Sequence, residues 1–168
     1  MPELNNQKFS HLKIHTQYSI CEGAIKIDNL KSFCKENKIA SLGLSDTSNL
    51  CGALEFAENI SKVGTQPIIG TQINFRYEDT TGLLPLIALN EKGYKRIIEL
   101  SSRSYLENDA LSDPHLDIKE LLRDTEGVLL LSGTIQGLFG KLFQKGRLEE
   151  ISKIYKSLLS KFHDNFYL

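Results

Sequence analysis

The sequence predicts an α/β fold in which a mainly parallel sheet is wrapped by helices. Short apolar runs alternate along the chain with segments whose apolar residues recur at helical spacing. The repeated order of strand and helix is typical of parallel sheets with right-handed crossovers. A length of 168 residues corresponds to one domain and is sufficient to bury a sizeable core.

Five apolar runs are predicted to be strands, at residues 9–15, 39–45, 68–77, 83–89 and 128–132. Residues 79–82 are turn-forming types and are expected to connect the third run to the fourth. Pro85 lacks an amide donor, so it favours an edge position or a bulge for the fourth strand. Residues 165–168 resemble the opening of another strand. We therefore expect a chain cut from a longer polypeptide, with an exposed sheet edge at its C-terminal end.

Helices are predicted between these strands. Ile27, Leu30 and Cys34 share one face of the first helix, and Ser48 and Asn49 offer a cap for a second helix that ends near residue 63. Further helices are expected at residues 91–106, 117–122 and 147–161. Three glycines are expected to break the segment at residues 133–140, and a loop is favoured there over a phosphate-binding turn.

Composition excludes some classes of function. Twenty basic residues stand against 21 acidic ones, so no overall field favours nucleic acid or an anionic membrane. Cys21, Cys34 and Cys51 have no metal-binding spacing and are expected to be reduced and buried. The first eight residues lack the apolar segment of a secretion signal, and no apolar run reaches membrane-spanning length. We expect a cytoplasmic protein without membrane contact.

Two residues with ligand-type side chains, His15 and Asp46, are placed at the carboxyl ends of the first two strands, where β/α proteins keep their chemistry. Each could hold a metal ion, but both have other interpretations. His15 could be a strand-end histidine satisfied by hydrogen bonds, which is favoured because Lys13 shares its face. Asp46 could be a general base or the cap of the next helix, and the sequence leaves these possibilities open.

The neighbours of this pair have the wrong chemistry for a metal site. Lys13 and Thr47 stand beside His15 and Asp46, and Gln72 supplies a neutral amide where a cation would need a carboxylate. We therefore expect a vestigial site without a bound metal and nominate no catalytic residue.

Several stretches occur together: FSHLKIHTQYS (residues 9–19), LSDTSNLCG (44–52), QPIIG (66–70), GY (93–94) and GVLLLSG (127–133). In this order they resemble the N-terminal PHP (polymerase and histidinol phosphatase) domain of the alpha subunit of bacterial DNA polymerase III. The resemblance implies a distorted parallel β/α barrel, truncated and incomplete here, with residues 1–168 as the N-terminal part of one PHP domain. The palm, thumb and fingers of the polymerase would lie outside this chain.

The resemblance also implies a metal-ligand pattern that this chain matches only in part. The family's ligand positions fall on Lys13, His15, Asp46, Thr47 and Gln72, and a later position falls on Thr134. Only His15 and Asp46 keep ligand chemistry, so they are weak metal candidates in a degenerate pocket.

The function implied by the resemblance is that of a scaffold. The parent chain would be a DNA-directed DNA polymerase that uses magnesium and contacts DNA, while this fragment would dock the proofreading exonuclease subunit and support the rest of the alpha chain. Little direct DNA contact is expected here. The alternative is a free-standing, metal-dependent phosphoesterase of the PHP type.

Overall fold

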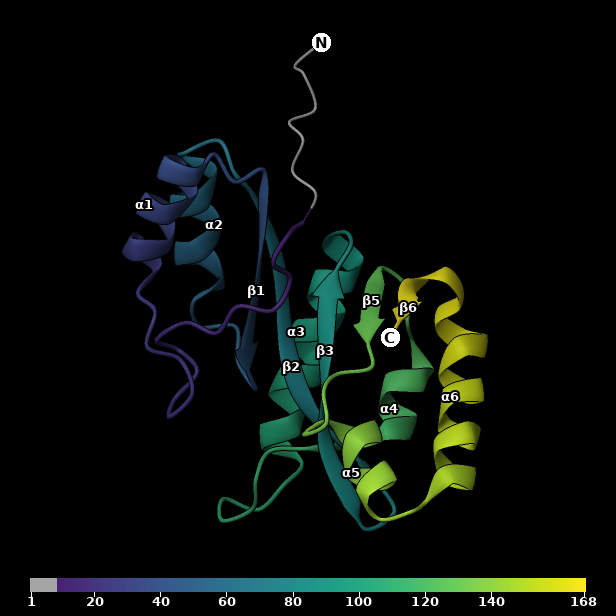
Figure 1. The fold of residues 1–168 in the computed structure, drawn as a ribbon. Coiled ribbons are helices and arrows are strands. Elements are labelled where there is room, and N and C mark those ends of the chain that lie inside the picture. The colour runs from purple at the N-terminus through teal and green to yellow at the C-terminus, as the bar shows by residue number, and fades with distance from the viewer. Residues whose placement is uncertain (1–8) are drawn as a thin grey trace.

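The computed structural model describes residues 9–168, so the expectation for the first eight residues lies outside it (Figure 1). The strands are β1 (Ser41–Thr47), β2 (Gln66–Tyr77), β3 (Thr80–Ala88), β4 (Leu116–Asp117), β5 (Val128–Leu131) and β6 (Phe166–Tyr167). The helices are α1 (Ile27–Asn37), α2 (Ala53–Ser61), α3 (Glu91–Leu106), α4 (Ile118–Arg123), α5 (Leu138–Gln144) and α6 (Leu148–Phe162), followed by the 3₁₀ turn η1 (His163–Asn165).

The described strands form one mixed sheet, which confirms the α/β class but not the mainly parallel arrangement. The strand order is β1-β2-β3-β5-β6, and β4 pairs with β2. The β1–β2, β2–β4 and β5–β6 pairs are parallel, whereas β2–β3 and β3–β5 are antiparallel. The antiparallel direction of β3 follows from its connection, because Tyr77 pairs with Thr80 across only two residues. So short a link can join antiparallel strands only.

Strand β3 lies inside the sheet, which corrects the edge position that Pro85 suggested. The predicted turn at residues 79–82 is shorter, because β3 already begins at Thr80. Pro85 pairs with Gln72 of β2, while β5 pairs only with residues 86–88. The proline therefore lies where β3 has a neighbour on one side, and the sheet accommodates its missing amide donor.

The predicted first strand, residues 9–15, is wrong as a continuous strand. Three backbone hydrogen bonds attach this segment to β1: Gly43 to His11 at 2.7 Å, Ile14 to Gly43 at 3.1 Å and Ser45 to Ile14 at 2.8 Å. Beyond them the chain leaves the sheet, since the amide of Thr16 donates to the side chain of Asp46 at 2.6 Å instead of to a carbonyl. The close approach needs Gly43, because a Cβ there would lie 2.7 Å from the Cα of Leu12.

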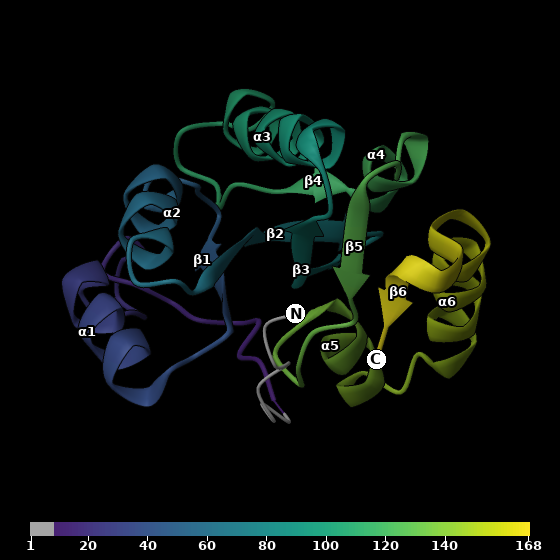
Figure 2. The same ribbon diagram turned by 90° about the horizontal axis from the view of Figure 1, so that it is seen from above.

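Helices cover both faces of the sheet (Figure 2). In that view α3 and α4 lie on one side of the central strands and α5 lies on the other. Side chains from these helices, from α6 and from β2, β3 and β5 form one apolar core, while α1, α2 and β1 form a second. The predicted helices at residues 91–106 and 147–161 are confirmed as α3 and α6.

Helix α5 was not predicted from the sequence, because glycines appeared to break the segment. Position 140 requires glycine, because a Cβ there would lie 2.2 Å from the carbonyl oxygen of Ile135. Leu138 and Leu142 are fully buried and hold α5 against the core. Tertiary burial thus outweighs the low helix propensity of the glycine.

The expected burial of all three cysteines is wrong. Cys34 is buried on the inner face of α1, whereas Cys21 and Cys51 are exposed, and all three are free thiols. Burial raises the pKa of the Cys34 thiol above its usual range. Within residues 9–168, no helix is both long enough and apolar enough to cross a membrane.

Candidate functional site

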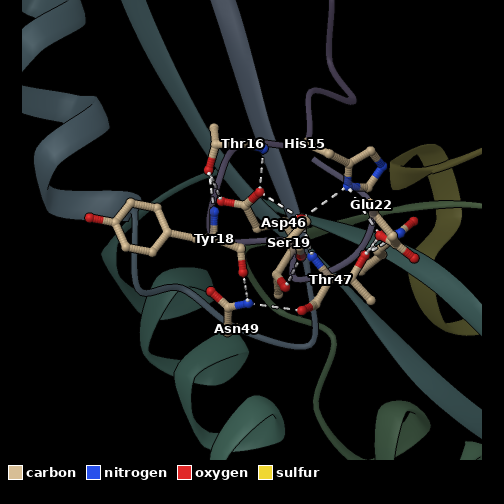
Figure 3. A network of polar contacts seen from close by, with 10 residues as sticks. His15, Thr16, Tyr18, Ser19, Glu22, Asp46, Thr47 and Asn49 are labelled. Carbon is tan, nitrogen blue, oxygen red and sulfur yellow. Dashed lines mark hydrogen bonds and ion pairs between the residues drawn. The ribbon is translucent and has the colours of Figure 1, made fainter. Parts of the chain in front are cut away.

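The candidate site lies where β1 ends and the loop of residues 16–23 folds over it (Figure 3). This loop begins where the extended segment leaves β1, directly after His15. It closes on itself through the amide of Gln17, which donates to the carbonyl of Ile25 at 2.9 Å. Its inner side meets Asp46 and Thr47, the last two residues of β1.

Asp46 is fully buried, and its carboxylate organises the loop. Oδ1 accepts hydrogen bonds from the Thr16 amide at 2.6 Å and from the Ser19 hydroxyl at 2.7 Å, while Oδ2 accepts from the Thr16 hydroxyl at 2.7 Å. Hydrogen bonds to an ionised carboxylate are among the stronger ones in proteins. The helix-cap interpretation of Asp46 is wrong, because the N-cap of α2 is Gly52 and no side chain caps that helix.

The same loop is also attached to α2. The Tyr18 hydroxyl donates to the Glu55 carboxylate at 2.7 Å, and this hydrogen bond raises the pKa of Tyr18. The side-chain amide of Asn49 donates to the carbonyls of Tyr18 and Thr47, each at 2.9 Å. Gly52 makes room for the tyrosine ring, because a Cβ there would lie 2.7 Å from Cδ2 of Tyr18.

Thr47 connects β2 to the loop. Its hydroxyl donates to the Glu22 carboxylate and accepts from the Gln72 side-chain amide at 2.7 Å. Its backbone amide donates to the Ser19 hydroxyl at 3.0 Å. The other polar atom of Gln72, Oε1, is buried and has no hydrogen-bond partner among the described residues.

His15 joins this network through Ser19. Its Nδ1 lies 3.3 Å from the Ser19 hydroxyl and 3.8 Å from the Glu22 carboxylate. The serine proton is already given to Asp46, so the serine oxygen can only accept. Nδ1 therefore carries the hydrogen, and Nε2 of the neutral ring is left as an acceptor.

Burial lowers the pKa of His15 below its ordinary value of 6.5. The nearby ammonium of Lys13 lowers it further, while the carboxylates of Glu22 and Asp46 act in the opposite direction. The ring is therefore neutral at pH 7, which agrees with its role as a donor through Nδ1 only.

Four of the six residues expected in the degenerate metal pocket line one small cavity. Lys13, His15, Gln72 and Thr134 surround a space of about 230 Å³, together with Glu22. The other two expected residues adjoin this group: Thr47 is hydrogen bonded to Gln72, and Asp46 is connected to His15 through Ser19.

Sequence reasoning missed Thr16, Ser19 and Glu22, which complete the network. All three lie in the loop after the extended segment, and none belongs to a motif with a spacing of its own. Hydroxyl residues directly after a strand that carries ligand-type side chains are a weak signal, since they also favour ordinary turns. Nothing local to Glu22 marks it as part of the site.

The donor set does not fit a bound metal ion. Both carboxylate oxygens of Asp46 accept hydrogen bonds from the loop, and the ammonium of Lys13 lines the cavity that a cation would enter. Within residues 9–168, no group of three or more histidine, cysteine, aspartate or glutamate side chains is placed to hold a metal. The arrangement serves to fix the loop against the strands.

Replacing Asp46 by asparagine should destabilise the protein by about 1–3 kcal/mol, because buried hydroxyl and amide donors lose a charged acceptor. Urea unfolding followed by circular dichroism would measure the change. The exposed Asp113→Asn is a suitable control and should change the free energy of unfolding by less than about 0.5 kcal/mol. Equal effects of the two substitutions would contradict the assigned role of Asp46.

The proton NMR signals of the His15 ring should titrate below pH 6.5. Lys13→Met should raise the pKa of His15 by removing a like charge, and Glu22→Gln should lower it by removing an opposite one. Because the folded-state pKa is depressed, the free energy of unfolding should fall as the pH drops below 6.5 and level off below the folded-state pKa. A ring that titrates above 6.5 would be inconsistent with this electrostatic assignment.

The chain matches the family model described as "PHP domain" over residues 11–168. It is 36% identical to the DNA polymerase III subunit alpha of Caulobacter vibrioides, over 100% of this chain and 15% of that protein. The same subunit of Rickettsia felis is 34% identical over 95% of this chain and 13% of that protein. The chain therefore spans about one seventh of the length of these curated relatives.

Two solved structures align with part of the chain. A protein described as a metal-dependent phosphoesterase of Bifidobacterium adolescentis is 16% identical with a TM-score of 0.47, covering 58% of this chain and 33% of that chain. An amidohydrolase of Chromobacterium violaceum is 15% identical with a TM-score of 0.48 and the same two coverages. The match to the family model covers nearly every described residue, and on this ground the chain belongs to the PHP domain family.

Proposed function

We propose that this chain is the N-terminal part of the PHP domain of a DNA polymerase III alpha subunit, where it acts as a scaffold. The likeness to alpha subunits along the whole chain carries this proposal. In the parent protein, DNA-directed polymerisation with magnesium would take place in domains outside residues 1–168. The remaining PHP strands would complete a distorted barrel that this sheet begins.

The non-catalytic role of the fragment is supported by how Asp46 is used. A carboxylate whose oxygens already accept three hydrogen bonds from the loop is a poor metal ligand and a poor general base. Lys13 and Gln72 place an ammonium and an amide at the cavity where a PHP phosphoesterase would need ligands. Among residues 9–168, no specific contact favours the free-standing phosphoesterase.

The proposed partners are the rest of the alpha chain and the proofreading exonuclease subunit, in the cytoplasm. A scaffold needs a surface that keeps its shape, and the loop of residues 16–23 is held directly by β1 and α2 and is linked to β2 through Thr47. Such pre-ordered surfaces lose less entropy on binding than mobile ones do.

The chain should not retain zinc or manganese after dialysis against micromolar metal. Lys13 brings a like charge to the cavity, and repulsion at ~4 Å costs on the order of 1–4 kcal/mol at surface dielectric values. Elemental analysis of the dialysed protein would give the metal content. Stoichiometric metal in the wild-type chain would overturn the degenerate site.

The chain should co-elute with the exonuclease subunit of the same organism in size-exclusion chromatography. Mixing the purified proteins at concentrations of about 10 μM, a value suited to the micromolar affinities of many transient complexes, and analysing the fractions by mass spectrometry would test this. The exonuclease mixed with an unrelated PHP phosphoesterase is the negative control. Separate elution at every concentration tested would reject the docking role.

A further inference from the structure

We infer that the groove between α1 and α2 binds the phosphate backbone of a nucleic acid duplex without reading its sequence. The two helices lie side by side in both views of the fold (Figures 1 and 2), and the groove shares no lining residue with the cavity beside His15. The inference goes beyond the proposed scaffold role. It revises the expectation of little direct DNA contact, because the balance of charges over the whole chain does not hold in this groove.

The charge of the groove is positive. Its volume of about 750 Å³ is lined by Asp28, Lys31, Ser32, Lys35, Lys62 and Val63. Three ammonium groups therefore stand against one carboxylate, and Asp28 lies in the first turn of α1, where its charge also interacts with the positive end of the helix. A concave surface with an excess of one sign of charge concentrates ligands of the opposite sign.

The three lysines have no carboxylate partner of their own. Among residues 9–168, the ammonium groups of Lys35 and Lys62 make no hydrogen bond or ion pair, and that of Lys31 donates only to Oδ1 of Asn59, at 3.5 Å. Glu58 lies one helical turn before Lys62 without pairing with it. Both lysines of α3, by contrast, form ion pairs. The positive charge of the groove is thus left for a ligand to neutralise.

The positions of these side chains suit a row of phosphates. Lys31 and Lys35 are four residues apart on α1, so they project from one face of the helix, one turn apart. Lys62 directly follows the last residue of α2 and adds its charge from the other helix. The exposed Ser32 hydroxyl lies on the α1 side and has no partner among the described residues. Lysine and serine side chains are common donors to phosphate oxygens of a nucleic acid backbone.

The residue types favour phosphates over an acidic protein or a membrane. Within residues 9–168, no arginine lines the groove, although the planar arginine fork is the group that binds carboxylates in two-point geometry. Lysine is a point charge and a common phosphate ligand. Val63 is the one apolar lining residue and is half-buried, whereas binding at a membrane interface needs an apolar face.

The lining also favours a duplex over a single strand. No aromatic side chain lines the groove within the described chain, so unpaired bases would find no surface on which to stack. No asparagine, glutamine or arginine of the described residues is placed there to read base edges. Contacts to the backbone alone are therefore expected, and the affinity should not depend on sequence.

Fluorescence anisotropy of a short labelled DNA duplex, titrated with the chain, tests this inference. In the groove variant, Lys31, Lys35 and Lys62 are all replaced by glutamine. At about 50 mM salt this variant should bind at least about tenfold more weakly than the wild type, because three phosphate contacts are lost. The slope of log affinity against log salt concentration should become shallower by about 2–3, since each phosphate contact contributes about 0.9.

A matched control removes the same charge from another surface. Lys153, Lys156 and Lys161 are exposed residues of α6, and their joint replacement by glutamine should leave the salt slope within about 0.5 of the wild type. Circular dichroism would check that both variants are folded. If the groove variant does not fold, the single Lys35→Gln should still reduce the slope by about 1.

The inference would be overturned by a wild-type chain that does not bind the duplex at about 50 mM salt, or by equal losses in the groove and control variants. The same protein should bind polyglutamate and phosphatidylserine vesicles at least about tenfold more weakly than the duplex. Equal or tighter binding to either would reject nucleic acid as the partner. Tighter binding to a single strand than to the duplex would reject the assignment to duplex backbone.

Discussion

The arrangement of this site depends on one buried carboxylate. Asp46 has no exposed surface, and an ionised side chain in such a place needs strong compensating hydrogen bonds. Thr16 and Ser19 provide them, so the loop after the extended segment must fold back over β1. Once the loop is there, Ser19 orients His15, and Glu22 comes within reach of Thr47.

The alternation of apolar runs and helical periodicity predicted the α/β class, since burial on both faces of a strand and on one face of a helix leaves a direct mark on the sequence. Strand direction leaves no such mark. The antiparallel course of β3 comes from a two-residue connection, Glu78 and Asp79. The sequence predicts a longer turn, at residues 79–82, because turn-forming residue types continue into the start of β3. Helix α5 was obscured because its glycines suggest breaks, whereas the burial of Leu138 and Leu142 that holds the helix depends on tertiary packing.

The candidate site was predictable only in part, and for a similar reason. Residues at strand ends can be located from the sequence, and Lys13, His15, Gln72 and Thr134 do meet at one cavity. The sequence does not predict which way each of these side chains points. Asp46 points to the loop and not into the cavity, while Glu22 reaches the site from a position that carries no pattern.

In the proposed scaffold role, the hydrogen bonds do what a metal cluster would otherwise do for the architecture. A metal joins strand ends by ligation, and its loss would ordinarily leave carboxylates facing each other. Here the Asp46 carboxylate accepts hydrogen bonds from the loop, and Thr47 joins β2 to the loop through Gln72 and Glu22. The strand ends stay connected by these hydrogen bonds. The catalytic role of such a site can therefore be lost while the surface that its loops present is kept.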